Sequence, residues 1–287
     1  MNARGGVADK RARVVSDLRR HTRILVALSG GVDSAVLLAL AREAVGAANV
    51  LAVTGVSPSI AQAELEDARS IARSLGVAHE LIHTREMDRP DYRANRGDRC
   101  FHCRSELFGL LSELATNRGF DAVAYGAITD DLGDHRPGMA AARDLGVLAP
   151  LVSSDIGKTD VRELARSLDI HIHEKPASAC LASRIPIGTE VTPERLLQVE
   201  RAEAALRRLG FRQLRVRHHG EIARLELDDE GLERVVSVRA EVSAAVREAG
   251  FRHVAVDLEG YRAGSLNVPG REPEALYSIA PARESGQ

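Results

Sequence analysis

A six-residue loop between two apolar runs carries the residue types of an anion-binding site. It reads Ser-Gly-Gly-Val-Asp-Ser and follows the short apolar run 24–28. Glycines let the main chain approach phosphate oxygens, serine hydroxyls can donate to them, and Asp33 can hold the Mg²⁺ that a polyphosphate requires. The alternative is a plain helix start with Asp33 as its cap. We expect an ATP site made by Ser29, Gly30, Gly31, Val32, Asp33 and Ser34.

A second glycine-containing segment does not form a Walker A motif. That motif needs a glycine five residues before its Gly-Lys-Ser/Thr end. In Gly157-Lys158-Thr159 the corresponding position is Val152. Lys158 instead stands at the start of a helix predicted over residues 159–168, where its charge either reaches a phosphate or is simply solvated. We expect Lys158 to contribute to the ATP site.

The chain has three cysteines, an odd number that does not make a disulfide framework. Cys100 and Cys103 lie three residues apart on one face of a predicted helix, and Cys180 is distant in sequence. The first two could be packed small hydrophobes or a redox pair, and zinc would need a fourth ligand. Three soft thiolates suit a [4Fe-4S] cluster with one open iron that can bind sulfide. We therefore expect a cluster at these three cysteines.

Charged side chains of the C-terminal half are further candidates. Arg184 lies near Cys180 in sequence, where it could lower the thiol pKa or bind a carboxylate or phosphate. Glu203 and Asp257 are candidate Mg²⁺ ligands. The simpler interpretation of Glu203 is a surface charge, because it lies on a predicted amphipathic helix.

Acidic and histidine-rich segments have simpler interpretations. An acidic loop follows a predicted strand at the edge where open α/β sheets bind ligands, but aspartates also form turns; it contains Asp130, Asp131 and Asp134. Two histidine pairs lack a third metal ligand nearby, so we interpret them as solvated faces of strands; they are His171 with His173 and His218 with His219.

The elements around the loop alternate between strands and helices. Strands are predicted at 24–28, 50–54, 77–84 and 122–125, and helices at 61–75 and at 98–117, the latter capped by Asp98 and closed by Gly119. This alternation implies right-handed crossovers and a parallel sheet covered on both faces. We expect residues 1–187 to form a doubly wound α/β domain.

The pattern changes after residue 188. A helix is predicted at 193–209, strands at 213–217 and 222–227, a helix at 232–249 and a strand at 253–258. This order suggests a smaller, mostly antiparallel α+β domain over residues 188–287, serving substrate binding or oligomerisation. The tails, residues 1–10 and 280–287, are expected to be disordered.

The composition excludes some classes of binding partner. With a formal net charge of −2 and a pI near 6.6, the chain has no overall attraction to nucleic acid or anionic membranes. Tryptophan is absent and aromatic residues total 3%, so a base-stacking surface is not expected. No run approaches the ~18 consecutive apolar residues of a membrane span. We expect a cytoplasmic protein without nucleic-acid or membrane partners, assembled as a homo-oligomer.

The loop at residues 29–34 resembles the signature of the PP-loop ATP pyrophosphatase superfamily, which includes NAD synthetase, GMP synthetase and tRNA thiolases. The resemblance implies cleavage of ATP between its α and β phosphates. AMP is transferred to a carboxylate or carbonyl oxygen, pyrophosphate is released, and a nucleophile then displaces AMP.

Further stretches are similar to the LarE family of ATP-dependent sulfur transferases in nickel-pincer nucleotide cofactor synthesis. They are the residues 29–34, 134–138 (DHRPG), 179–188 (ACLASRIPIG), 216–218 (VRH) and 257–264 (DLEGYRAG). The similarity spans nearly the whole chain. It implies adenylylation of pyridinium-3,5-biscarboxylic acid mononucleotide, a small-molecule nucleotide, and conversion of its carboxylates to thiocarboxylates.

The resemblance also implies roles for individual residues. Asp33 and Cys180 become the catalytic residues. In one branch of the family the cysteine matching Cys180 gives up its own sulfur, and in the other three cysteines hold a [4Fe-4S] cluster that relays sulfide from a donor. Cys100 and Cys103 place this chain in the second branch. Such a substrate carries a ribose phosphate, which Arg215 and Arg217 on one strand face could clamp together with Arg184, unless they are solvated edge arginines.

Two other functions remain open at this point. A tRNA thiolase would share the loop and the cysteines but should carry an RNA-binding domain or a basic surface, which the near-neutral charge disfavours. A nucleotide-binding sensor would keep the loop without turnover. Release of pyrophosphate from ATP distinguishes the sensor from the enzymes.

Overall fold

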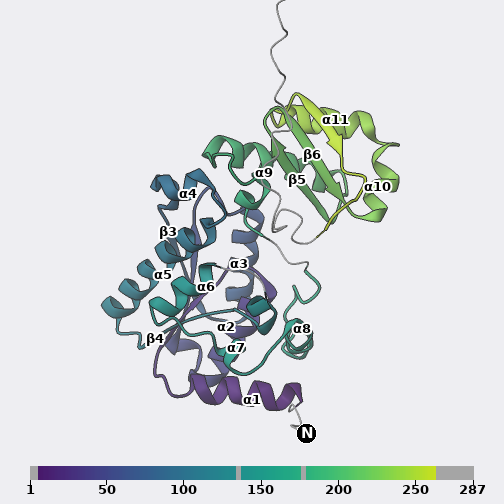
Figure 1. Ribbon diagram of the computed structural model, residues 1–287. Helices are drawn as coiled ribbons and strands as arrows, with labels where there is room; N and C mark the ends of the chain where they lie inside the picture. The colour runs from purple at the N-terminus through teal and green to yellow at the C-terminus, as the bar shows by residue number, and fades with distance from the viewer. Residues whose placement is uncertain (1–5, 134–136, 176–178, 263–287) are drawn as a thin grey trace, which may run out of the picture.

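The computed structural model describes residues 6–133, 137–175 and 179–262 (Figure 1). Four parallel strands form the N-terminal sheet, and the predicted strands are confirmed. They are β1 (Ile24–Ala27), β2 (Val50–Val56), β3 (Ala78–His83) and β4 (Ala122–Tyr125), in the order β3-β2-β1-β4. Ile24 is in register with Val50 on one side and with Ala122 on the other. The carboxyl ends of β1, β2 and β4 therefore meet at one edge of the sheet.

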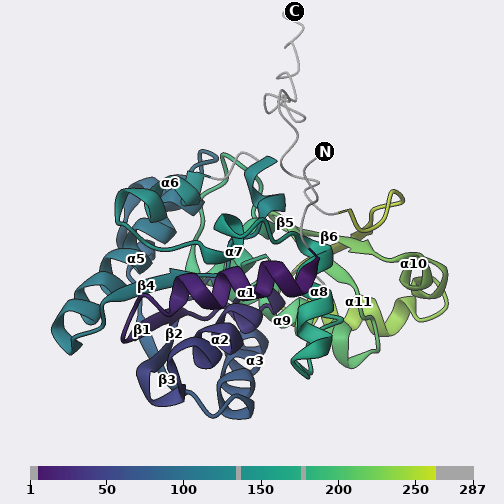
Figure 2. The same cartoon turned by 90° about the horizontal axis from the view of Figure 1, so that it is seen from below.

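Helices cover both faces of this sheet, as Figure 2 shows from below. Alternate strand residues enter two different cores: Ile24 and Val26 face one, and Leu25 faces the other. The first core contains α1 (Val7–Leu18), α2 (Val32–Val45), α3 (Gln62–Ser74) and α8 (Lys158–Ser167), and the second contains α5 (Arg99–Arg118) and α6 (Pro137–Asp144). The predicted doubly wound α/β architecture is confirmed.

Short elements complete the N-terminal part. They are η1 (Ala47–Asn49), η2 (Glu86–Asp88), α4 (Pro90–Ala94), η3 (Thr129–Gly133), α7 (Pro150–Ser153) and η4 (Leu181–Arg184). The expected disorder of residues 1–10 is wrong for residues 7–10, which begin α1. That helix is held by its buried face of Val14, Val15 and Leu18 and by the Asp9 carboxylate, which accepts the Gly6 N–H at 3.1 Å. The expected C-terminal tail lies outside the described residues.

The C-terminal part has a small three-stranded sheet with helices on it. Its elements are α9 (Pro193–Arg208), β5 (Leu214–His219), β6 (Ile222–Leu227), α10 (Asp229–Val235), α11 (Arg239–Glu248) and β7 (His253–Val256). β5 and β6 are antiparallel, but β6 and β7 are parallel because two helices cross over between them. The sheet is therefore mixed and not mostly antiparallel.

The single helix predicted at 232–249 is two helices. The Asp228 carboxylate accepts the Gly231 N–H at 2.9 Å and starts α10 earlier than expected. The Ser237 hydroxyl donates to the Arg234 carbonyl at 2.7 Å, so a side chain takes up a helix carbonyl at the break between the two helices.

The two parts are joined at the sheet edge that carries the loop. The turn η4 contributes Leu181 and Ala182 to the core of the C-terminal part, and Ile185 follows it there. Glu200 of α9 accepts the N–H of Gln62, the first residue of α3, at 2.6 Å. The domain boundary at residue 187 stays a prediction. No helix in the described part of the chain is long and apolar enough to cross a membrane.

Candidate active site

The loop at residues 29–34 leaves β1 and enters α2 as predicted. Ser34 ties it together, because its hydroxyl donates to the Gly31 carbonyl at 2.9 Å and accepts the Ser29 N–H at 3.2 Å. The N-cap residue of α2 is Gly31, which has no side chain to accept the N–H groups of the first turn. An uncapped helix start with a glycine-rich approach is a site for an anion.

Two glycines make the tight packing of this loop possible. Gly30 has φ +78°, and a Cβ on it would lie 2.4 Å from the Glu64 carbonyl oxygen. Gly126, directly after β4, approaches the first turn of α2 so closely that a Cβ would lie 2.7 Å from the Ser34 nitrogen. Gly126 was not singled out from the sequence, where only its position after a strand could have indicated it.

Lys158 meets the loop from the start of α8. Its Nζ lies 3.0 Å from Asp33 Oδ1 and 3.3 Å from Asp33 Oδ2, and both side chains are about 29% exposed. The structure thus brings together two residues predicted to serve the ATP site. Their opposite charges partly neutralise each other at the loop that is predicted to bind ATP and Mg²⁺.

The acidic loop after β4 supports this arrangement. Asp130 Oδ2 accepts the Lys158 N–H at 2.8 Å, and Asp131 Oδ2 accepts the Ile128 N–H at 3.1 Å. Both carboxylates thus accept backbone N–H groups, as the alternative of turn-forming aspartates predicts. Asp134 lies outside the described residues.

A second lysine contacts the loop and was missed in the sequence. Lys175 Nζ donates to the Gly30 carbonyl at 3.0 Å, to Glu64 Oε2 at 2.7 Å and to Asp67 Oδ2 at 2.6 Å. It thereby connects the loop to α3. Nothing in its local sequence indicates these partners, which lie more than one hundred residues earlier in the chain.

The cysteine-bearing segments also gather at this edge. Leu181, next to Cys180, donates its N–H to the Ser59 carbonyl in the turn after β2 at 2.8 Å. Arg99, next to Cys100 at the start of α5, donates to the Ala182 carbonyl. These contacts hold the Cys180 turn between the turn that follows β2 and the start of α5.

The three thiols are electrostatic neighbours. Burial raises the pKa of the Cys103 thiol, and negative charge on Glu86, Cys180 or Cys100 raises it further. None of the three forms a disulfide; Cys100 and Cys180 are exposed and Cys103 is partly buried. Tyr92 lies in the same neighbourhood, because its pKa is raised by burial and then by charge on Cys180. The structure thus brings together cysteines that lie about eighty positions apart in sequence.

The three thiols are the ligands predicted for a metal centre. Within residues 6–133, 137–175 and 179–262, no group of three or more His, Cys, Asp or Glu side chains is arranged to hold one metal ion. A cluster binds each thiolate at a different iron, so it needs thiols around a larger space than one ion does. The three thiols supply the soft ligands that such a cluster prefers, and the cluster itself stays a prediction.

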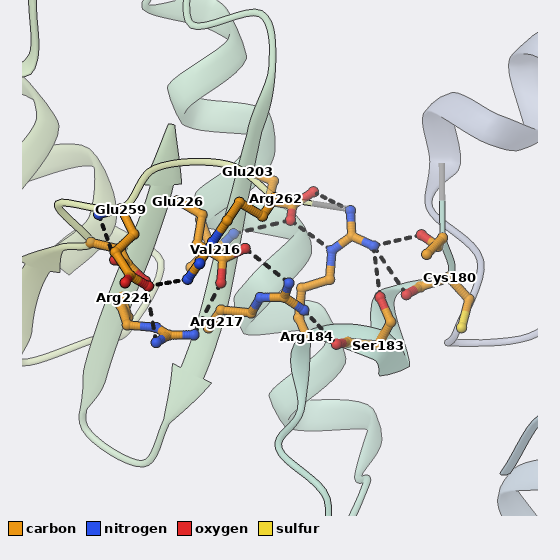
Figure 3. Close-up of polar contacts among 12 residues, drawn as sticks. Cys180, Ser183, Arg184, Glu203, Val216, Arg217, Arg224, Glu226, Glu259 and Arg262 are labelled. Atoms are coloured by element: carbon orange, nitrogen blue, oxygen red, sulfur yellow. Dashed lines mark hydrogen bonds and ion pairs between the residues drawn. The ribbon is translucent and has the colours of Figure 1, made fainter. Parts of the chain in front are cut away.

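A buried ion pair connects the Cys180 turn to the C-terminal part (Figure 3). Arg184 Nε donates to Glu203 Oε1 at 2.8 Å, and its Nη1 donates to the Ala179 and Cys180 carbonyls. Glu203 is 1% exposed and also accepts from Arg207 and from the Val216 N–H. Its two nearby arginines hold its pKa low against the opposing effect of burial. The surface-charge interpretation of Glu203 is therefore wrong, while its role as a Mg²⁺ ligand stays a prediction.

The two arginines of β5 are buried, so the interpretation as solvated edge residues is wrong. Arg217 is 1% exposed and donates to Glu226 Oε2 and to the Ser183 carbonyl, both at 2.8 Å. Arg215 is 8% exposed, and its guanidinium lies over the Tyr261 ring at 4.7 Å. Burial lowers the pKa of Arg215. The structure gives Arg217 a carboxylate partner and shows no ion pair for Arg215 among the described residues.

Asp257 pairs with Arg224, and among the described residues none of the partners of Glu203 forms an ion pair with it. Its Oδ2 lies 3.3 Å from Arg224 Nη1, and Arg224 Nη2 lies 3.0 Å from Glu226 Oε1. Asp257 therefore belongs to the chain of ion pairs around Arg217. Its role as a Mg²⁺ ligand also stays a prediction.

The histidine pairs agree with the expectation in part, since His171 and His219 are exposed. Residues 171–174 form turns and not a strand, and the His173 ring nitrogen Nδ1 lies 3.1 Å from the Ile170 carbonyl. His218 is 3% exposed and contacts Gln198 at 3.1 Å, so it lies in the C-terminal core and not on a solvated face. α9 covers β5 at this position. The alternation of residue types along one strand does not show which faces are covered by a helix.

Comparison with known proteins gives matches over most of the chain. Residues 12–96 match the family model described as NAD synthase. The chain is 35% identical to pyridinium-3,5-bisthiocarboxylic acid mononucleotide synthase of Lactiplantibacillus plantarum, over 91% of this chain and 95% of that protein. It is 44% identical to an uncharacterized protein of Synechocystis sp., over 85% and 92%. A tRNA-specific 2-thiouridylase of Syntrophus aciditrophicus is 31% identical, but over only 60% and 54%.

Proposed function

Because the chain belongs to the family of pyridinium-3,5-bisthiocarboxylic acid mononucleotide synthases, we propose that it is an ATP-dependent sulfur transferase of nickel-pincer cofactor synthesis. The LarE family predicted from the sequence is thereby confirmed. One observation in the structure carries the proposal: Asp33 and Lys158 meet at the uncapped start of α2, beside a glycine-rich loop. This arrangement supplies backbone donors, a cation and a carboxylate for ATP with Mg²⁺.

The first step is adenylylation. A carboxylate oxygen of pyridinium-3,5-biscarboxylic acid mononucleotide attacks the α phosphorus of ATP, the bond to the β-phosphate oxygen breaks, and pyrophosphate leaves. The loop N–H groups and Lys158 bind the phosphates, and Asp33 would hold Mg²⁺. Bound Mg²⁺ supplies charge neutralisation on the phosphates.

The second step transfers sulfur. Sulfide attacks the carbonyl carbon of the acyl adenylate, the bond to the AMP oxygen breaks, and thiocarboxylate and AMP leave. Cys100, Cys103 and Cys180 would hold a [4Fe-4S] cluster, which when bound supplies an iron site for sulfide. The support for this cluster is geometric: Cys103 packs against the core that contains Leu181, next to Cys180, and Arg99, next to Cys100, donates to the Ala182 carbonyl. None of the three thiols forms a disulfide.

The substrate phosphate is assigned to the arginines around β5. Arg215 is buried, stacked on Tyr261 and without an ion-pair partner among the described residues, so it has capacity for an anion. Arg217 is held by Glu226, and Arg184 is held by Glu203. We expect all three to face the nucleotide, with Arg215 carrying most of the phosphate binding. Cytoplasmic location, the sulfide donor and homo-oligomeric assembly stay predictions.

The test uses the anaerobically purified protein with ATP, Mg²⁺, sulfide and pyridinium-3,5-biscarboxylic acid mononucleotide. We expect pyrophosphate release that depends on the mononucleotide, and a product whose mass shows oxygen replaced by sulfur. Iron and acid-labile sulfide are measured in the same preparation. Tight ATP binding without pyrophosphate release would instead indicate a nucleotide-binding sensor.

A further inference from the structure

Lysine is rare in this chain, and two of its lysines contact the ATP loop. Of the 39 lysine and arginine residues only three are lysine, at positions 10, 158 and 175. Lys158 contacts Asp33, and Lys175 contacts Gly30. A lysine offers three donors around one small ammonium, whereas an arginine presents a planar fork.

The Lys175 ammonium has three N–H donors, and each of them has its own acceptor. The acceptors are the Gly30 carbonyl, Glu64 Oε2 and Asp67 Oδ2, all within 3.0 Å of Nζ. The lysine side chain is 18% exposed, and that of Glu64 is 20% exposed. Three acceptors converging on one ammonium fix the position of Nζ, and the carbonyl is held with it.

The contact with Gly30 determines which way the next N–H points. The Gly30–Gly31 peptide is trans, since the described residues contain no cis peptide bond. In a trans peptide the carbonyl and the N–H point in opposite directions. With the carbonyl directed to Lys175, the Gly31 N–H is on the exposed side of the loop, where it donates to the Ser29 hydroxyl at 3.4 Å. That side of the loop is where phosphate oxygens would be bound.

We infer that Lys175 is a positioning residue of the ATP site, which holds the Gly30 peptide so that the Gly31 N–H faces the phosphates. This inference rests on the proposed function only in taking ATP as the ligand. Lys175 also neutralises Glu64 and Asp67, two carboxylates that α3 places beside an anion-binding loop. Charge compensation alone is a structural role, so the experiment separates it from positioning.

Three variants make that separation. Lys175→Met removes the ammonium, and the triple variant Lys175→Met/Glu64→Gln/Asp67→Asn also removes the carboxylates that it leaves unpaired. Lys10→Met is the matched control, because Lys10 is a 12% exposed lysine paired with Asp160 at 2.7 Å and does not contact the loop. Thermal melting reports stability, and calorimetric titration with ATP and Mg²⁺ reports affinity.

We expect a lower melting temperature for Lys175→Met, and we expect the triple variant to recover most of that loss because no partly buried carboxylate is left without its cation. ATP affinity should stay at least about tenfold below wild type in both, since a misdirected N–H loses a hydrogen bond to a charged ligand. Lys10→Met should bind ATP within about twofold of wild type. A triple variant that binds ATP as tightly as wild type would overturn the positioning role. Wild type that binds ATP but releases no pyrophosphate would refute the proposed function and leave the affinity comparison to decide the role of Lys175.

Discussion

Lys158 Nζ lies 3.0 Å from Asp33 Oδ1, although the two residues are 125 positions apart in the chain. The contact joins the starts of α8 and α2, the two helices whose first turns face the loop. A carboxylate suited to Mg²⁺ and a cation suited to phosphate thus occupy one place, each partly neutralised by the other. ATP with Mg²⁺ brings the opposite charges for both.

Replacing Asp33 with Asn should abolish adenylylation and leave the fold intact. The substitution keeps the size of the side chain but removes the charge that holds Mg²⁺. We expect pyrophosphate release to fall on the order of 10²-fold or more, the loss typical of a removed transition-state contact. Release within about threefold of wild type would rule out the metal role of Asp33. Circular dichroism serves as the control for folding.

The two arginines of β5 should respond differently to replacement with Ala. Arg215→Ala should raise the concentration of nucleotide substrate needed for half-maximal rate, with little change in ATP dependence, because Arg215 has no described ion-pair partner to lose. The measurement is steady-state pyrophosphate release at varied concentrations of each substrate. Equal effects on both substrates would indicate a structural role instead.

Arg217→Ala is the comparison for that variant. It removes one of the arginines that pair with Glu226, a carboxylate that is 1% exposed and also contacts Arg224. Breaking a buried pair costs about 3 kcal/mol or more. We expect a clearly lower free energy of unfolding for Arg217→Ala in denaturant titration, and a smaller loss for Arg215→Ala.

If the three cysteines hold one cluster, replacing any one of them should remove it. Cys100→Ser, Cys103→Ser and Cys180→Ser should each remove the broad visible absorption of the anaerobically prepared protein, because each thiolate holds a different iron. Sulfur transfer should be lost with the absorption. With sulfide supplied, wild type should form more than one product molecule per chain.

A sacrificial Cys180 predicts another pattern. Only Cys180→Ser would then stop sulfur transfer, and intact wild-type protein after one turnover would be lighter by the mass of H₂S. Intact-protein mass spectrometry before and after turnover decides between the two chemistries. Active protein without iron would contradict the cluster and leave the ATP site unaffected.

Stability should decrease as the pH falls, in part through His218. Burial lowers the pKa of His218, and the charge of Arg195 lowers it further. A lowered folded-state pKa means that the unfolded chain binds the proton more readily. The stabilisation is therefore complete above the unfolded-state pKa of about 6.5 and is lost as the pH falls below it. His218→Leu should show a smaller fall in melting temperature between pH 7.5 and pH 5.5, whereas an identical slope would refute this contribution.

Local sequence patterns were enough to predict the elements that are determined by interactions within a few residues. The strand at 24–28, its glycine turn and the helix that follows are predictable because period, turn residues and helix propensity act within a few residues. The same is true of α5, which ends at Gly119 with φ +66° as its sequence indicates. Cys100, Cys103 and Cys180 could be proposed as one site from residue type and from the family resemblance.

Only the tertiary structure decided which of these residues meet. The partners of Lys158, Lys175 and Glu203 are set by the packing of α8, α3 and the Cys180 turn against other elements, and no period along the chain encodes them. Glu203 shows the difference: on an amphipathic helix it has the pattern of a surface charge, yet it is 1% exposed because Arg184 and the Val216 N–H satisfy its carboxylate. The sequence determined the chemistry available to this protein, and the folded chain determined the contacts, because a buried charge is tolerated only where distant segments supply its partners.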